Sequence, residues 1–124
     1  MAETVSRILQ RTDSGLRWEP DLLAARNDVV VMIDCKASMT SRSTGRHAVE
    51  RAAVKAHQLL AAFYDLPLYY VFDNLGVLTP LDVRGAGRRG PHSTVGSGAP
   101  YYLVDAAVDR RFDDIFGTVP ARVA

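Results

Sequence analysis

Apolar residues follow two different periods along this chain of 124 residues, and the period changes at turn residues. Residues 2–11 place Val5, Ile8 and Leu9 at helical spacing, which predicts a short amphipathic helix. Residues 29–33 form a continuous, mostly β-branched apolar run that is too short for an ordinary helix. That run predicts a buried strand.

A second, shorter strand is predicted at residues 22–25, and the turn at 26–28 would join it to the first as a hairpin. Pro20 lacks a backbone donor and suits the first position of a strand or an edge, so Asp21 is expected at the open end of this hairpin. Residues 16–18 are expected to begin a further strand, with Trp18 in the core.

The longest helical pattern runs from residue 46 to residue 64, without glycine or proline. Its expected inner stripe consists of Val49, Ala53, Ala56, Leu60 and Phe63. His57 falls beside that stripe and is expected at its boundary. This helix would cover the sheet.

Apolar runs at residues 66–73 and 77–81 predict a central strand and a short strand that ends at an edge. Residues 84–99 are expected to form a basic loop rich in glycine and serine. A strand at 100–104 and a helix at 108–116 would follow, so the chain is predicted to be mixed α/β.

Composition sets the outer limits. The length suits one domain with a single core, and the hydrophobic content of 48% indicates a folded chain. One cysteine excludes a disulfide framework, and three scattered histidines give no zinc spacing. No apolar run reaches membrane length and no signal-peptide profile is present, so we expect an intracellular, reducing compartment and no membrane partner.

The net charge of +1 says little about partners, but the charges are unevenly distributed. No acid lies between Asp34 and Glu50, or between Asp82 and Asp105. The basic residues of these two stretches that we expect to contact DNA phosphates are Arg42, Arg46, Arg84, Arg88 and Arg89. For any single arginine, ordinary solvated surface is the favoured interpretation.

Candidate chemistry gathers at the predicted hairpin. Side chains alternate along a strand, so Asp34 and Lys36 share one face and Cys35 the other. Asp21 would join them where the apolar strand ends. Burying three charges there is costly unless they pair or hold a metal ion. A simple surface ion pair between Asp34 and Lys36 is the structural alternative.

Pro20-Asp21 followed by Asp34-Cys35-Lys36 resembles the signature of the PD-(D/E)XK nuclease superfamily, and is most similar to that of archaeal-type Holliday junction resolvases and small phage nucleases. The resemblance implies a restriction-endonuclease-like αβββαβ core with a mixed central sheet flanked by helices. That core would span about residues 2–83 of a single domain at 1–124. The basic loop 84–99 and a C-terminal strand and helix at 100–117 would follow.

The resemblance also implies a metal-dependent DNA endonuclease, structure-directed and acting as a homodimer. Asp21, Asp34 and the main-chain carbonyl of Cys35 would hold Mg²⁺ or Mn²⁺, and Lys36 would orient or deprotonate the attacking water. Members of the superfamily often carry an extra acid on the first helix, which here is Glu3. The acids that remain as other candidates to complete the metal shell are Glu19 and Glu50.

Two other function classes fit the same residues. The fold could serve as a catalytically inactive DNA-binding or assembly subunit, or as an α/β binding domain in which Asp34 and Lys36 only pair. Metal-dependent cutting of DNA separates these from the nuclease.

Overall fold

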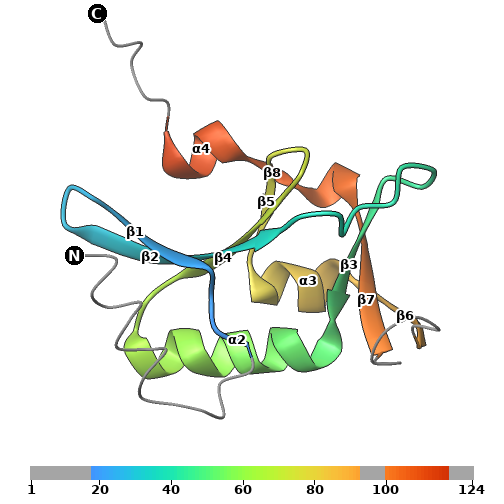
Figure 1. The fold of residues 1–124 in the computed structure, drawn as a ribbon, viewed down its shortest axis with the longest axis horizontal. Helices are drawn as coiled ribbons and strands as arrows, with labels where there is room; N and C mark the ends of the chain where they lie inside the picture. Colours follow the sequence, from blue (N-terminus) through green and yellow to red (C-terminus); the bar gives the residue numbers. More distant parts are fainter. Residues whose placement is uncertain (1–17, 93–99, 118–124) are drawn as a thin grey trace, which may run out of the picture.

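The computed structural model describes residues 18–92 and 100–117, whose strands form two sheets (Figure 1). The larger sheet has the order β1 (Leu22–Arg26), β2 (Val29–Lys36), β4 (Leu68–Phe72), β5 (Gly76–Leu78) and β8 (Arg110–Arg111). The smaller has the order β3 (Arg46–Glu50), β7 (Pro100–Asp105) and β6 (Arg88–His92). The helical segments are α2 (Arg51–Tyr64), α3 (Pro80–Ala86), the 3₁₀ turn η1 (Ala106–Val108) and α4 (Phe112–Phe116).

The larger sheet is mixed and has helices on both sides. Strand β2 pairs antiparallel with β1 and parallel with β4. Helices α2 and α3 lie on one side of the sheet and α4 on the other (Figure 1). Tyr70 of β4 is buried and bonds to His57 of α2, whereas its neighbour Tyr69 contacts the ring of Phe116 in α4. The alternation along β4 therefore serves both layers.

One hydrophobic core joins the two sheets to α2 and α3. Its buried members are Leu23, Met32, Val49, Val54, Leu60, Leu68, Tyr70, Phe72, Leu78, Val83 and Val104. Because β3 and β7 each contribute a fully buried valine to this cluster, the smaller sheet is anchored to the same core as the larger one.

The predicted hairpin is present. Arg26 pairs with Val29, and the two residues between them, Asn27 and Asp28, both have positive φ, at 50° and 67°. These angles are those of a two-residue type I′ turn, whose twist matches that of the flanking strands. The turn fixes the register in which Leu22 pairs with Ile33.

The helix predicted from residue 46 is wrong in its first turn. Residues 46–50 form β3, which pairs antiparallel with β7, and the helix begins at Arg51. With its start shifted, α2 turns Val54 and His57 inward and leaves Phe63 80% exposed. Val49 is buried as predicted, but from a strand, because pairing with β7 outweighs the local helical pattern.

The strand predicted at 77–81 and the loop predicted at 84–99 are corrected as well. The strand ends at Leu78, and Thr79 caps helix α3, which continues to Ala86. The side chain of Thr79 accepts from the Asp82 amide, and the Asp82 carboxylate accepts from the Thr79 amide, both at 3.0 Å. Residues 88–92 are strand β6, and residues 93–99 lie outside the described part of the chain.

The C-terminal helix predicted at 108–116 is divided into three pieces. Val108 ends η1 and is 43% exposed, Arg110–Arg111 pair with β5, and only α4 is α-helical. Asp109 accounts for the break, because its carboxylate turns inward to the buried His47. The strand predicted at 100–104 is confirmed as β7.

The helix predicted at residues 2–11 and the first two residues of the strand predicted from residue 16 lie outside the described residues. Trp18 is half-buried, not a core residue. The order of elements from β1 to β4 is βββαβ, as the resemblance implied, but the third strand is β3 of the smaller sheet.

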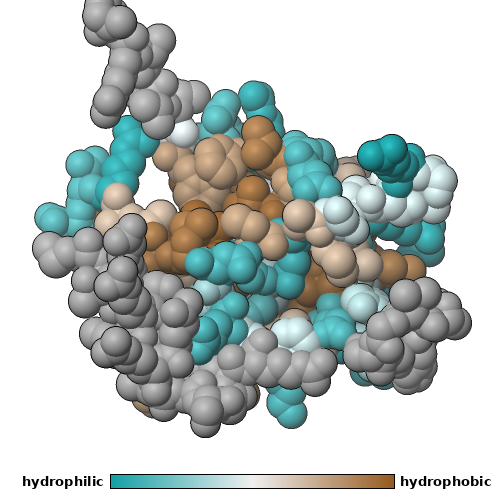
Figure 2. Space-filling view, in the orientation of Figure 1, coloured by the Kyte–Doolittle hydropathy of each residue, from teal (hydrophilic) through white to brown (hydrophobic). Residues whose placement is uncertain are grey.

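An apolar groove of about 620 Å³ lies between the β1–β2 hairpin and α4. Figure 2 shows hydrophobic surface gathered over this region. Its floor includes Val29, Val31 and Ile33 of β2, and one wall includes Phe112 and Phe116. Within the described residues, no helix is both long enough and apolar enough to cross a membrane.

Candidate active site

The hairpin brings Asp21 and Asp34 together across its open end. Asp21 immediately precedes β1, and its Oδ2 accepts a 2.6 Å hydrogen bond from the main-chain N–H of Cys35. Asp34 is one residue earlier on β2 and is buried, with 6% exposure. The pairing of the two strands therefore brings the carboxylates together. Cys35, which lies 14 positions after Asp21 in the sequence, holds Asp21 in place.

Lys36 completes the cluster. Its Nζ lies 2.7 Å from Oδ2 of Asp34, and the two side chains are only 17% and 9% exposed. The same ammonium group lies 5.2 Å from the centre of the Tyr70 ring, which offers it a favourable π face. Lys36 is therefore held on the same face of the sheet as Asp34, as strand alternation predicted.

The electrostatics of Asp21 reflect this crowding. Burial raises the pKa of its carboxyl group, and the nearby Asp34 raises it further through its charge and a side-chain hydrogen bond. The Cys35 N–H and the charge of Lys36 act in the opposite direction. A carboxyl group whose pKa is raised by a neighbouring carboxylate lies where a cation would be stabilised.

The oxygen atoms of this cluster suit a Mg²⁺-type ion, although they fill only part of its coordination shell. The described residues hold no group of three or more His, Cys, Asp or Glu side chains placed for a metal, so the protein oxygens on offer are those of Asp21 and Asp34 with the Cys35 carbonyl. Magnesium is commonly held by one or two carboxylates, with waters and substrate phosphates filling its remaining positions. An open shell of this kind is compatible with an ion that binds together with a phosphate.

The other acids considered for the metal shell stay predictions, and one of them lies on a different element than expected. Glu3 lies outside the described residues. Glu19 is half-buried two residues before Asp21. Glu50 is the last residue of β3, where it pairs with Tyr101, and is not on the helix as predicted.

The five arginines predicted to contact DNA are all exposed. Arg42 lies in the loop between β2 and β3, and Arg84 lies on α3. Arg46, Arg88 and Arg89 belong to the smaller sheet. Since Arg88 and Arg89 are consecutive on a strand, they project to opposite faces, and one flat duplex surface cannot engage both equally.

The sequence interpretation missed the buried polar layer beneath the cluster. His57, expected at a boundary, is 1% exposed and bonds to Tyr70, whose backbone pairs with Asp34. The available signal was the position of His57 three residues after Val54 and three before Leu60, which places all three on one face of α2.

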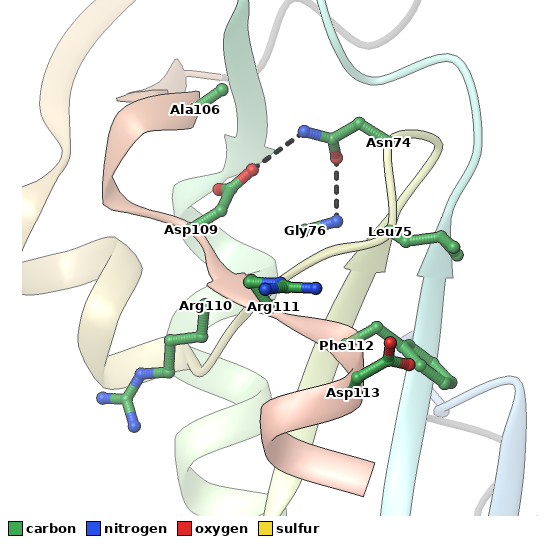
Figure 3. Close-up of a pocket in the computed structure, with 9 residues that line it drawn as sticks. All are labelled: Asn74, Leu75, Gly76, Ala106, Asp109, Arg110, Arg111, Phe112 and Asp113. Carbon is green, nitrogen blue, oxygen red and sulfur yellow. Dashed lines mark hydrogen bonds between the residues drawn. The ribbon is translucent and has the colours of Figure 1, made fainter. Parts of the chain in front are cut away.

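A second polar cluster surrounds Asp109, beside a pocket of about 300 Å³ (Figure 3). Nε2 of His47 lies 2.7 Å from the Asp109 carboxylate, and Nδ1 lies 2.6 Å from the Thr40 hydroxyl. Asn74 donates to Asp109 and accepts from the Gly76 amide. Because these groups satisfy one another, the cluster fastens β3 to η1 and to the β4–β5 turn.

Comparison with known proteins gives information on the fold alone. The sequence matches no family model and no curated protein. The structure is similar to Hjc, a Holliday junction resolvase from the archaeal hyperthermophile Archaeoglobus fulgidus, with a TM-score of 0.56 and 11% identity. That match covers 86% of this chain and 80% of the resolvase.

A second similar structure is D212, a nuclease from a fusselovirus, with a TM-score of 0.50 and 16% identity. The match covers 84% of this chain and 67% of D212. Both proteins share the arrangement of strands and helices, and the identities are too low to carry residue roles across.

Proposed function

We propose that this chain, which has the restriction-endonuclease-like fold of the PD-(D/E)XK nucleases, is a metal-dependent DNA endonuclease. The observation that carries the proposal is the convergence of Asp21, Asp34 and Lys36 at the open end of one hairpin. A buried carboxylate with a second carboxyl group and a half-buried ammonium beside it is energetically costly for a purely structural role.

In this proposal Asp21, Asp34 and the Cys35 carbonyl hold Mg²⁺ or Mn²⁺. The bound ion would lower the pKa of a coordinated water and neutralise charge that develops on the phosphate. Asp34 holds the Lys36 ammonium at 2.7 Å, so that Lys36 can orient the water that attacks phosphorus. The attacking water would lose a proton to solvent as its oxygen bonds to phosphorus, the bond to the 3′ oxygen would break, and that oxygen would take a proton from solvent. No covalent enzyme intermediate is required.

The exposed arginines would neutralise phosphates beside the cut. Arg42 is on the loop that leaves β2 directly after Lys36, and Arg46 begins β3 at the end of that loop. Both are therefore close in sequence to the cluster and contact the backbone without reading bases. Arg84 on α3 and one of the two arginines on β6, Arg88 or Arg89, would extend this basic surface, since those two project to opposite faces of their strand.

We further propose that the substrate is a branched DNA and that the active form is a homodimer. The support is the fold shared with a Holliday junction resolvase, because a four-way junction requires two matched cuts. Light scattering would then give twice the chain mass of 13.6 kDa. The alternative is an inactive subunit of the same fold that binds DNA without cutting it.

The direct test is nicking of linear, branched and single-stranded DNA by purified protein, with Mg²⁺, with Mn²⁺ and with EDTA. We expect metal-dependent cutting, with a preference for the branched substrate. Asp34→Ala and Lys36→Ala should each reduce the rate by at least about 10²-fold, because each removes a group that contacts the reacting atoms or the ion.

Asp113→Ala is the matched control, since Asp113 is an exposed carboxylate on α4. It should cut at the wild-type rate, and circular dichroism should show all variants folded. Cutting at the wild-type rate by Asp34→Ala would refute the site. Binding without cutting in every metal would favour the inactive subunit.

A further inference from the structure

A buried histidine lies directly beneath the proposed site. His57 is 1% exposed between α2 and β4, and both of its ring nitrogens have partners. Nε2 lies 2.7 Å from the main-chain carbonyl of Trp18, and Nδ1 lies 2.6 Å from the Tyr70 hydroxyl. A carbonyl can only accept, so Nε2 carries the proton and Nδ1 accepts from Tyr70.

The charge state of the ring agrees with this assignment. Burial, with a smaller contribution from the charge of Lys36, lowers the pKa of His57 to about 4, against the opposing effects of the Trp18 carbonyl and the charge of Asp21. The ring is therefore neutral at neutral pH. A neutral imidazole with one donor and one acceptor, each satisfied, is a fixed connector and not a proton-transfer group.

Each partner of His57 leads to a different part of the cluster. Trp18 precedes Asp21 by three residues and is joined to it through the buried Pro20. Tyr70 pairs with Asp34 in the β2–β4 register, and its ring lies beneath the Lys36 ammonium. These contacts form a closed chain. Asp21 binds the Cys35 amide on β2, β2 pairs with β4 at Tyr70, and Tyr70 binds His57. His57 in turn binds Trp18, which precedes Asp21 in the sequence.

We propose that His57 is a positioning residue of the proposed nuclease site, because it ties the segment that carries Asp21 to the tyrosine that supports Lys36. This inference rests on the proposed function. The Cys35 N–H and the Asp34 side chain hold the Asp21 carboxyl group to β2, and a second anchor on the segment before β1 would fix the angle at which that carboxyl group leaves the strand. The hydrogen bond from Nε2 of His57, on α2, to the main-chain carbonyl of Trp18 is that anchor.

The other buried histidine provides an internal comparison. His47 is fully buried and bonds at both ring nitrogens, to Thr40 and Asp109, and its ring stacks on Phe72 at 3.8 Å. None of these partners belongs to the proposed site. Loss of His47 should therefore cost stability without changing the geometry of the cluster.

The test uses side chains that keep one contact at a time. Asn at position 57 places its amide near the Nδ1 position and cannot reach Trp18, whereas Gln is longer and can donate to the Trp18 carbonyl. His57→Asn should lower kcat for nicking by about 10- to 100-fold with KM within about twofold, because a small displacement of a reacting group costs rate more than binding. His57→Gln should recover most of kcat, and His47→Asn should leave it unchanged.

A second measurement does not depend on activity. Trp18 is the single tryptophan, so its fluorescence reports the segment that His57 holds. In metal-free, folded protein, His57→Asn should shift the Trp18 emission and raise its quenching by acrylamide. His57→Gln and His47→Asn should match the wild type in both.

The outcomes separate the two proposals. A wild-type protein that cuts no DNA overturns the proposed function and the catalytic half of this inference. Wild-type kcat in folded His57→Asn overturns the positioning role alone. Unchanged Trp18 fluorescence in that variant overturns the anchor, whatever the protein cuts.

Discussion

At the scale of single residues, the pKa of the Cys35 thiol depends on the charges of the carboxylates beside it. Its side chain is exposed, and its main-chain N–H binds Asp21. Burial raises the pKa of the Cys35 thiol, and the charges of Asp21 and Asp34 raise it further. As the single cysteine, it can be followed without labelling any other site.

We expect Asp21→Asn to speed alkylation of Cys35 by iodoacetamide about two- to threefold near pH 8, because loss of one negative charge increases the thiolate fraction. Asparagine can still accept the Cys35 N–H, so the backbone should be preserved. Added Mg²⁺ should speed alkylation in the wild type by the same mechanism. Asp113→Asn is the control, and a rate that no Mg²⁺ concentration changes would argue against an ion at these carboxylates.

The convergence of Asp21, Asp34 and Lys36 could be predicted from the sequence because it depends on strand alternation and on one hairpin. Asp34 and Lys36 share a face in any regular strand, and the turn at Asn27-Asp28 fixes what lies opposite them. His57 and Tyr70 were not accessible in the same way. Their contact joins a helix to a strand, and which face of α2 is buried depended on where the helix begins.

At the scale of elements, the errors have a common physical origin. Residues 46–50 alternate as well as a strand requires, and β7, more than 50 positions later, decides between strand and helix. Helix α3 did have a local signal that was overlooked. Thr79, Pro80 and Asp82 supply an N-cap, a first-turn proline and a capping-box acid, which together begin a helix.

Two glycines give a matched test of how the elements are joined. A Cβ on Gly76 would collide with the Asp109 carboxylate, whereas a Cβ on Gly85 in α3 meets nothing within 4 Å. Gly76 lies beside the Asp109 carboxylate (Figure 3). We expect Gly76→Ala to lower the free energy of unfolding by about 2–4 kcal/mol, because it displaces Asp109 from the buried His47.

Gly85→Ala should instead raise the free energy of unfolding by about 0.5–1 kcal/mol, since alanine is the better helix former. Urea unfolding followed by circular dichroism measures both variants. Equal stability of the two would mean that the contact between β5 and the Asp109 segment carries little of the fold.

At the scale of the whole molecule, stability should depend on pH through His57. Its pKa falls from 6.5 in the unfolded chain to about 4 in the folded one. Between these values the unfolded state binds a proton that the folded state does not, so acid favours unfolding. The stabilisation is complete above about pH 6.5 and is lost as the pH falls to about 4.

The comparison of wild type with His57→Gln isolates this contribution. Relative to the variant, the wild type should lose roughly 3 kcal/mol of unfolding free energy between pH 7 and pH 4. Asp21, whose pKa is raised, responds to acid in the opposite sense, but it is present in both proteins and cancels in the difference. Urea titrations at several pH values give the two curves, and parallel curves would contradict a neutral, buried His57.

The two-residue turn of the hairpin has a consequence for how this protein can change. The spacing of Asp21 and Asp34 is set by a ladder of main-chain bonds, so side-chain exchanges in the interior leave it in place. An inserted or deleted residue at Asn27-Asp28 would slide one strand past the other and turn the face of β2 that carries Asp34 and Lys36 away from the core. Substitutions that keep the length of this turn therefore preserve the pairing of the two strands, whereas a change of length at these two exposed positions destroys it.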